Sequence, residues 1–166
     1  VAVVLGLVAA VSLATAPVLA ANERASATHG LASIVRVRLA TPADEAARSV
    51  SRYLVTRDPG ELTPLDDALS RAGEGTEALR HAASDAHVAD DLDPAVQGVR
   101  SAVGALEAAA AAVRAGEDPD QGDVDRLATA SGALVSATAV LETAVEGEMV
   151  AAVDDVGEAA QRALAV

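Results

Sequence analysis

Apolar residues recur at alternating spacings of three and four along most of this chain, and this repeat most constrains its fold. Such spacing places one apolar stripe along a helix and is typical of helices that pack in coiled coils and bundles. No stretch of the sequence shows the sustained apolar–polar alternation of half-buried strands. The pattern therefore predicts an all-α fold. The clearest run comprises Leu62, Leu65, Leu69, Ala72, Thr76, Leu79, Ala83 and Ala86.

The apolar side chains are almost all alanine, valine and leucine, which favours closely spaced helices. Aromatic residues make up 1% of the chain, and Tyr53 is the sole one. β-Sandwiches and barrels rely on aromatic and β-branched residues, so this composition argues against them. Small side chains instead let helix axes approach one another closely.

Proline, glycine and aspartate divide the chain into four predicted helices. The first runs from the N-terminal apolar segment to about Thr56, and Pro42 lies inside it. A proline at that position either kinks the helix or starts a new one that Thr41 caps. Asp58-Pro59-Gly60 then forms a turn. The second helix is expected to begin between residues 61 and 64, with Thr63 as a cap, and to run to about Asp90.

The third and fourth predicted helices follow similar signals. Asp93 is expected to cap the third helix, with Pro94 at its first position, and the helix ends at about Ala115. A polar loop over residues 116–122 leads to the fourth helix, which starts near Asp123 and runs to the end. The third helix carries the apolar seam Val96, Val99, Val103, Leu106, Ala110 and Val113.

The fourth helix shows a change of repeat. Its first part keeps leucines seven residues apart, whereas spacings of four dominate later and approach an eleven-residue repeat. Short loops and four helices predict an up-down-up-down four-helix bundle, with the first and last helices projecting beyond it on the same side. The seam residues of this helix are Leu127, Leu134, Leu141, Val145, Met149, Val153, Val156, Ala160 and Leu164.

The segment 1–22 is apolar and carries no charge. Twenty helical residues span roughly 30 Å, the thickness of the hydrocarbon layer of a bilayer. We predict a transmembrane helix over 1–22 and an extracytoplasmic domain over 23–166. Two alternatives stay open: a signal peptide cleaved after Ala20, and a buried core helix. The chain starts with Val, which fits both a fragment of a longer protein and an alternative start codon.

Net charge and cysteine content exclude several functions. The chain carries 25 acidic and 12 basic residues, for a net charge of −13. Such a surface repels phosphate backbones, so we expect no nucleic-acid partner. Cysteine is absent, so the chain has no disulfide, thiolate metal site or cysteine nucleophile.

The stretch Arg52-Tyr53-Leu54-Val55-Thr56-Arg57-Asp58-Pro59-Gly60-Glu61-Leu62 resembles the CHASE3 family. In that family a Gly-Tyr-Leu-Leu-Thr-Gly-Asp-like turn joins the first two helices. Tyr53, Leu54, Thr56 and Asp58 carry the match, whereas Arg57 stands where glycine is usual. On physical grounds Tyr53 is expected to lay its ring against the bundle tip with its hydroxyl in water. Thr56 and Asp58 are expected to hydrogen-bond backbone groups at a helix end.

The resemblance implies an extracytoplasmic sensor domain of a bacterial histidine kinase, chemoreceptor or cyclase. A cytoplasmic output module would then follow beyond residue 166. The long helices also favour a parallel homodimer, and the ligand or protein partner is left open. The alternative is an exported or membrane-anchored helical bundle that serves as a structural or interaction protein.

No pattern of catalytic residues stands out, so we predict that the chain is not an enzyme and binds no cofactor. His81 and Asp85 lie one helical turn apart, and His87 follows, which makes these three residues weak metal-ligand candidates. A solvated polar face is the favoured interpretation. The acidic loop 117–125 invites a calcium-binding interpretation but departs from the EF-hand template. A solvated acidic loop is favoured there as well. Glycines within the helices favour close packing, with a soft, bistable bundle as the functional alternative.

Overall fold

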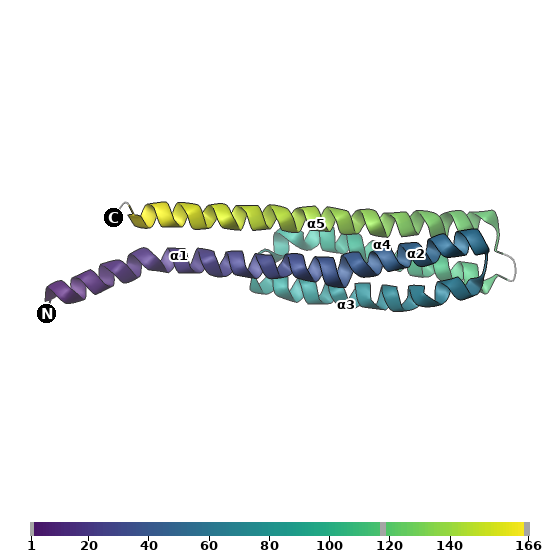
Figure 1. The fold of residues 1–166 in the computed structure, drawn as a ribbon, viewed down its shortest axis with the longest axis horizontal. Coiled ribbons are helices and arrows are strands. Elements are labelled where there is room, and N and C mark those ends of the chain that lie inside the picture. The colour runs from purple at the N-terminus through teal and green to yellow at the C-terminus, as the bar shows by residue number, and fades with distance from the viewer. Residues whose placement is uncertain (1, 117–118, 165–166) are drawn as a thin grey trace.

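The structure is a computed structural model that describes residues 2–116 and 119–164, with side chains from residue 15 onward. It is an all-α bundle of four packed helical segments (Figure 1). The first segment combines α1, the π-helical turn η1 and α2, and the 3₁₀ turn η2 leads into the second. The elements are α1 (Ala2–Val35), η1 (Arg36–Ala40), α2 (Thr41–Thr56), η2 (Pro59–Leu62), α3 (Thr63–Asp85), α4 (Ala89–Ala115) and α5 (Gln121–Leu164).

Successive segments run antiparallel, and the two long ones extend past the others (Figure 1). The start of α1 and the end of α5 lie at the same end of the molecule, as the helix lengths predicted. Beyond the turn between α3 and α4, α1 and α5 continue side by side. The molecule therefore has a four-helix part with a tip, at the turn between α2 and α3, and a two-helix base.

The predicted seams form the core. Every residue of the α3 repeat and of the α4 repeat is buried. Leu127, Leu134 and Leu141 of α5 face them and are at most 1% exposed. Burying a leucine side chain contributes about 2 kcal/mol to folding stability. Many such buried aliphatic side chains along the seams therefore stabilise this core, where an ordinary core would rely on a few large aromatic residues.

Pro42 is accommodated inside a continuous helix by the π turn η1. A helical proline lacks an N–H, and its ring collides with the carbonyl four residues earlier, here that of Arg38. In η1 the N–H of Thr41 donates to the carbonyl of Arg36, five residues back. Thr41 itself is helical, with φ −60° and ψ −51°. The predicted alternative of a new helix capped by Thr41 is therefore wrong, because one inserted residue relieves the clash without a break.

The π turn packs against α3 at Gly75. A Cβ built on Gly75 would overlap the carbonyl oxygen of Arg38 and lie 2.9 Å from Cδ2 of Leu39. A Cβ built on Gly73, by contrast, would have no neighbouring atom within 4 Å. Gly75 thus allows two backbones to touch, whereas Gly73 has no such neighbour.

The boundary between α3 and α4 differs from the prediction. The second helix ends at Asp85 rather than near Asp90, and the next begins at Ala89 rather than at Pro94. Val88 and Leu92 are 6% and 1% exposed, so they extend the α4 seam by one more turn. Their burial outweighs the helix-stop signal, because a proline near a helix start sacrifices only one hydrogen bond at an exposed site.

The seam at the end of α5 also differs from the prediction. Val153 and Leu164 are 63% and 88% exposed, so the expected eleven-residue shift is wrong. The buried residues of this part are instead Val145, Ala152 and Ala159, seven residues apart. Only α1 packs beside this part of α5 (Figure 1). One narrow alanine stripe is enough to contact a single helix.

Two further expectations concern the helix starts. Thr63 lies within α3 and is helical, so it does not cap that helix as predicted. The proposed span 1–22 falls largely on residues 1–14, which lie outside the part with described side chains. In the described part, α5 is the one helix long and apolar enough to cross a membrane, and 33% of that window is buried. Since its leucines lie in the core, we assign α5 to the bundle.

We predict opposite effects of alanine at the two neighbouring glycines of α3. Gly75→Ala lowers the free energy of unfolding by about 1–3 kcal/mol, because the methyl group overlaps the π turn. Gly73→Ala, the matched control, raises it by about 1 kcal/mol, because alanine favours the helix. Urea unfolding followed by circular dichroism measures both. Equal stability of the two variants would refute the close approach of η1 to α3.

Candidate functional site at the bundle tip

The turn between α2 and α3 begins with a residue in a left-handed conformation. Arg57 has φ 58° and ψ 17°, and its N–H donates to the carbonyl of Tyr53 at 2.8 Å. A left-handed residue ends a helix by turning the chain away from the axis, and glycine adopts it at least cost. The resemblance places glycine at this position, and the backbone conformation gives that preference a physical reason.

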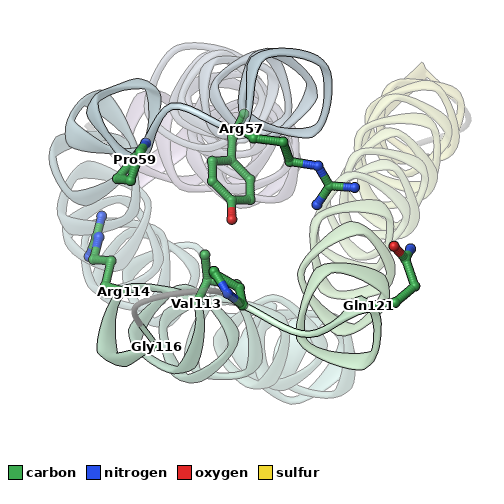
Figure 2. A pocket seen from close by; sticks show the side chains of 8 residues that line it. Arg57, Pro59, Val113, Arg114, Gly116 and Gln121 are labelled. Atoms are coloured by element: carbon green, nitrogen blue, oxygen red, sulfur yellow. The ribbon is translucent and has the colours of Figure 1, made fainter.

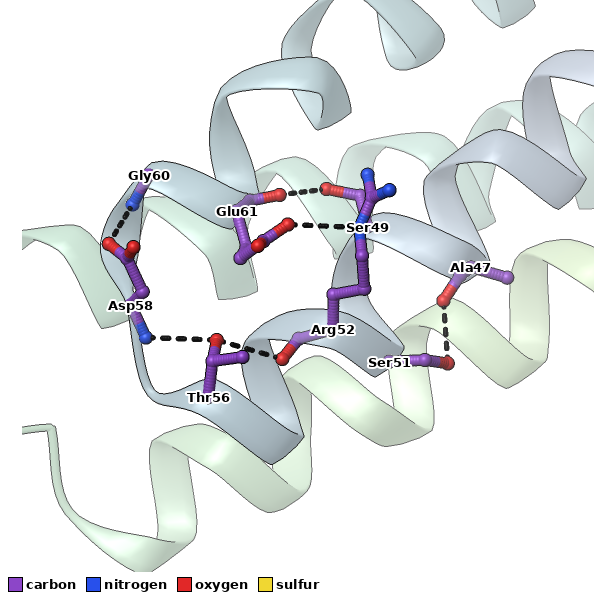
Figure 3. A network of polar contacts seen from close by, with 8 residues as sticks. All are labelled: Ala47, Ser49, Ser51, Arg52, Thr56, Asp58, Gly60 and Glu61. Atoms are coloured by element: carbon purple, nitrogen blue, oxygen red, sulfur yellow. Dashed lines mark hydrogen bonds and ion pairs between the residues drawn. The ribbon is translucent and has the colours of Figure 1, made fainter.

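Side-chain hydrogen bonds then hold the turn (Figure 3). The hydroxyl of Thr56 donates to the carbonyl of Arg52 at 3.0 Å and accepts from the N–H of Asp58 at 3.2 Å. A carboxylate oxygen of Asp58 accepts from the N–H of Gly60 at 2.9 Å. Thr56 and Asp58 thus hydrogen-bond backbone groups as expected, and these contacts explain both residue types by turn structure.

A second set of contacts joins the turn to the side of α2 (Figure 3). The hydroxyl of Ser49 donates to the carbonyl of Glu61, and Ser49 is fully buried. The guanidinium of Arg52 pairs with the carboxylate of Glu61, with 2.9 Å between Nε and Oε2. Sequence reasoning missed Ser49, although a serine within an apolar stripe could have identified it as a buried polar group that needs a partner.

Tyr53 is buried at the tip rather than laid on its surface. Tyr53 is 2% exposed and belongs to the core, so its ring lies inside the bundle. Leu54, the next motif residue, is half-buried and packs against the same core. The one aromatic ring of the chain fills the bundle where the helices end.

A cavity of about 430 Å³ opens beside Tyr53, between the turn and the loop that joins α4 to α5 (Figure 2). The guanidinium of Arg114 is occupied there, since it donates to the Leu62 carbonyl at 2.7 Å and pairs with Asp66 at 2.9 Å. The remaining lining residues are Arg57, Pro59, Val113, Gly116, Pro119 and Gln121.

The cavity offers hydrogen-bond donors beside apolar walls, which suits binding rather than a chemical step. Among the described residues of its lining there is no carboxylate pair. Sequence reasoning missed Arg114 and Gln121 because they come from a different loop. The up-down layout alone could have placed that loop beside the motif turn.

The weak metal-ligand candidates lie at the other end of α3. His81 is exposed on α3, and Asp85 is the last residue of that helix. His87 lies in the following turn with φ 60°, a left-handed conformation. Among the residues that the structure describes, no group of three histidines, aspartates or glutamates could hold a metal ion.

The acidic loop before α5 is only partly described, because residues 117 and 118 lie outside the described ranges. The carboxylate of Asp120 accepts from the N–H of Asp123 at 2.8 Å. The carboxylate of Asp123 in turn pairs with the guanidinium of Arg126. These described acids therefore stabilise the start of α5, where negative charge complements the helix dipole.

The chain gives no significant match to a protein-family model, a curated protein or a solved structure. The all-α four-helix bundle is therefore established from the geometry alone.

We predict that Arg57→Gly stabilises the protein by about 1 kcal/mol, because glycine removes the strain of a left-handed side chain. Arg57→Ala is the matched control, since it removes the side chain but keeps a Cβ. It should leave the free energy of unfolding nearly unchanged. Thermal melts of the two variants measure the difference, and a glycine variant no more stable than the alanine variant contradicts the assigned turn.

Proposed function

We propose that this chain is the extracytoplasmic sensory domain of a bacterial membrane receptor of the CHASE3 type. In this proposal residues 1–22 cross the membrane, and residues 23–166 form the bundle outside the cytoplasm. The observation that carries the proposal is the continuity of α1. This helix is continuous from the uncharged segment into the bundle, with Pro17 inside it, so a displacement of the bundle part would be passed to the segment.

The arrangement of the helix ends supports the proposed orientation. The start of α1 and the end of α5 share one end of the molecule, and the tip lies at the other (Figure 1). Near the base, Arg24 of α1 pairs with Asp155 of α5, with 3.0 Å between the charged atoms. Glu23 and Arg24 are the first charges of the chain, at the boundary expected between lipid and water.

Signal transmission would use the contact between α1 and α5. A ligand, a partner protein or a mechanical load at the tip would favour one relative position of these helices over another. The π turn η1 lies on this path, and π-bulges inside helices frequently occur at functional sites. A slide of α1 would then cross the membrane toward an output module such as a kinase or a cyclase.

The rival proposal is an exported or membrane-anchored structural bundle that binds another protein. The observation that favours it is the weakly charged outer face of α4 and α5, described below. A cleaved segment would separate the two proposals, because a receptor must keep its connection to the membrane.

We predict that the chain, expressed with its native flanking sequence in bacteria, sediments with membranes and resists alkaline extraction. Replacing Leu7 and Leu13 with arginine should release it, because each charge costs about 3 kcal/mol at the centre of a bilayer. Replacing the exposed Ser26 and Ser33 with arginine is the matched control. A soluble exported species that begins near Ala21 would instead favour the rival.

A further inference from the structure

The outer face of the α4–α5 pair almost lacks charge. We define this α4–α5 face by the exposed residues Ala105, Ala108 and Ala112 of α4 and Thr129, Ala133, Ser136 and Val140 of α5. No charged residue occurs in α5 from Leu127 to Leu141. On α4, Glu107 lies on the side toward α3, where it lines a groove with Glu77 and Arg100.

The other helices follow the usual rule for surface helices. Asp67, Arg71 and Glu74 are exposed on α3, and Asp44 and Arg48 are exposed on α2. A helix whose outward face is also uncharged is typically buried by a further partner. The contrast is sharp because the chain carries 25 acidic residues and concentrates them elsewhere.

A groove runs along the α4–α5 face. Its volume is about 660 Å³, and alanines of both helices form most of its lining. Thr129, Asp125 and Arg126 complete the lining on the side of α5. Exposed Ala105, Ala108 and Ala112 follow spacings of three and four on α4. Ala133, Ser136 and Val140 follow the same spacings on α5, outside the buried seam. The face therefore carries a second helical repeat of the kind that packs against other helices.

Lipid does not fit this face. The uncharged part of α5, from Leu127 to Leu141, extends about 22 Å, which is shorter than the roughly 30 Å of a bilayer core. Its leucines are also committed to the bundle interior.

We propose that a second copy of this chain covers the α4–α5 face and forms a two-fold symmetric dimer. Two chains that each carry a net charge of −13 repel one another, so they approach at least cost through a face with few acids. Asp125 reaches this face only at the start of α5, where Arg126 lies next to it in the groove lining. A basic partner protein would instead be recognised by a face rich in carboxylates. Uncharged stripes of small residues are self-complementary, as an isologous interface requires.

The size of the face agrees with a modest dimer. The surrounding stretch of α4, residues 98–115, by two helix widths covers roughly 27 Å by 20 Å, or about 1,000 Å² for both copies together. That area lies at the lower bound of specific interfaces, so the dimer is expected to be weak in solution. Confinement in a membrane would raise its effective concentration. The α4–α5 face is part of the bundle whether or not the chain is a membrane receptor.

The absence of cysteine makes crosslinking a direct test. In cells that express the full chain, Ala108→Cys or Ala133→Cys should give a crosslinked dimer with a short bismaleimide. The yield should exceed several-fold that of Ser70→Cys, which places a thiol on the exposed face of α3. The crosslink is scored in whichever cell fraction holds the protein, so its failure is separate from a failure of membrane attachment.

A charge variant provides the second arm. Adding Ala133→Glu to Ala108→Cys places like charges across the interface and should abolish the crosslink, whereas adding Ser70→Glu should not. Circular dichroism of the purified variants verifies that the helices remain. Crosslinking at Ser70→Cys equal to that at both face positions overturns the proposal, and so does a crosslink that survives Ala133→Glu.

Discussion

Close approach of helix backbones is the constraint on which the rest of this structure depends. Alanine, valine and leucine fill the core, and each alanine buries little area. A stable bundle therefore needs long seams and axes close enough for short side chains to meet. The contact of Gly75 with the carbonyl of Arg38 is the extreme case, because two backbones touch there with no side chain between them.

The same constraint shapes both ends of the molecule. At the base, Ala152 and Ala159 of α5 form a narrow stripe that meets only α1. At the tip, one tyrosine closes the core where the helices end, and hydrogen bonds around Asp58 hold the turn. Ion pairs along the rims join α2 to α3, α3 to α4 and α1 to α5, but exposed pairs contribute little stability.

Between these ends, the π turn interrupts the regular α-helical hydrogen bonding of the long first segment. It lies between the base and the tip and is held against α3 by Gly75. In the proposed receptor, a displacement of α1 relative to α3 would have to alter this contact. The close contact between η1 and Gly75 would therefore respond to the helix displacement that the proposed receptor needs.

Much of the fold could be predicted from sequence, because apolar repeats report which helix face is buried. The α3 and α4 seams and the four-helix layout were confirmed. The predicted start of α4 at Pro94 was wrong, because the burial of Val88 and Leu92 outweighs the tendency of Pro94 to mark a helix start. The tip cavity could not be predicted, since Tyr53 and Gln121 meet only through tertiary packing. The π turn was missed because its cause, Pro42, permits several local solutions.

The most direct test of the account is the side of the membrane on which the bundle lies. A cysteine at exposed Ser70 of the full chain is treated with a membrane-impermeant maleimide in spheroplasts. The account predicts labelling before lysis, in protein that remains with the membrane. Labelling only after lysis would place the bundle in the cytoplasm and contradict the receptor orientation.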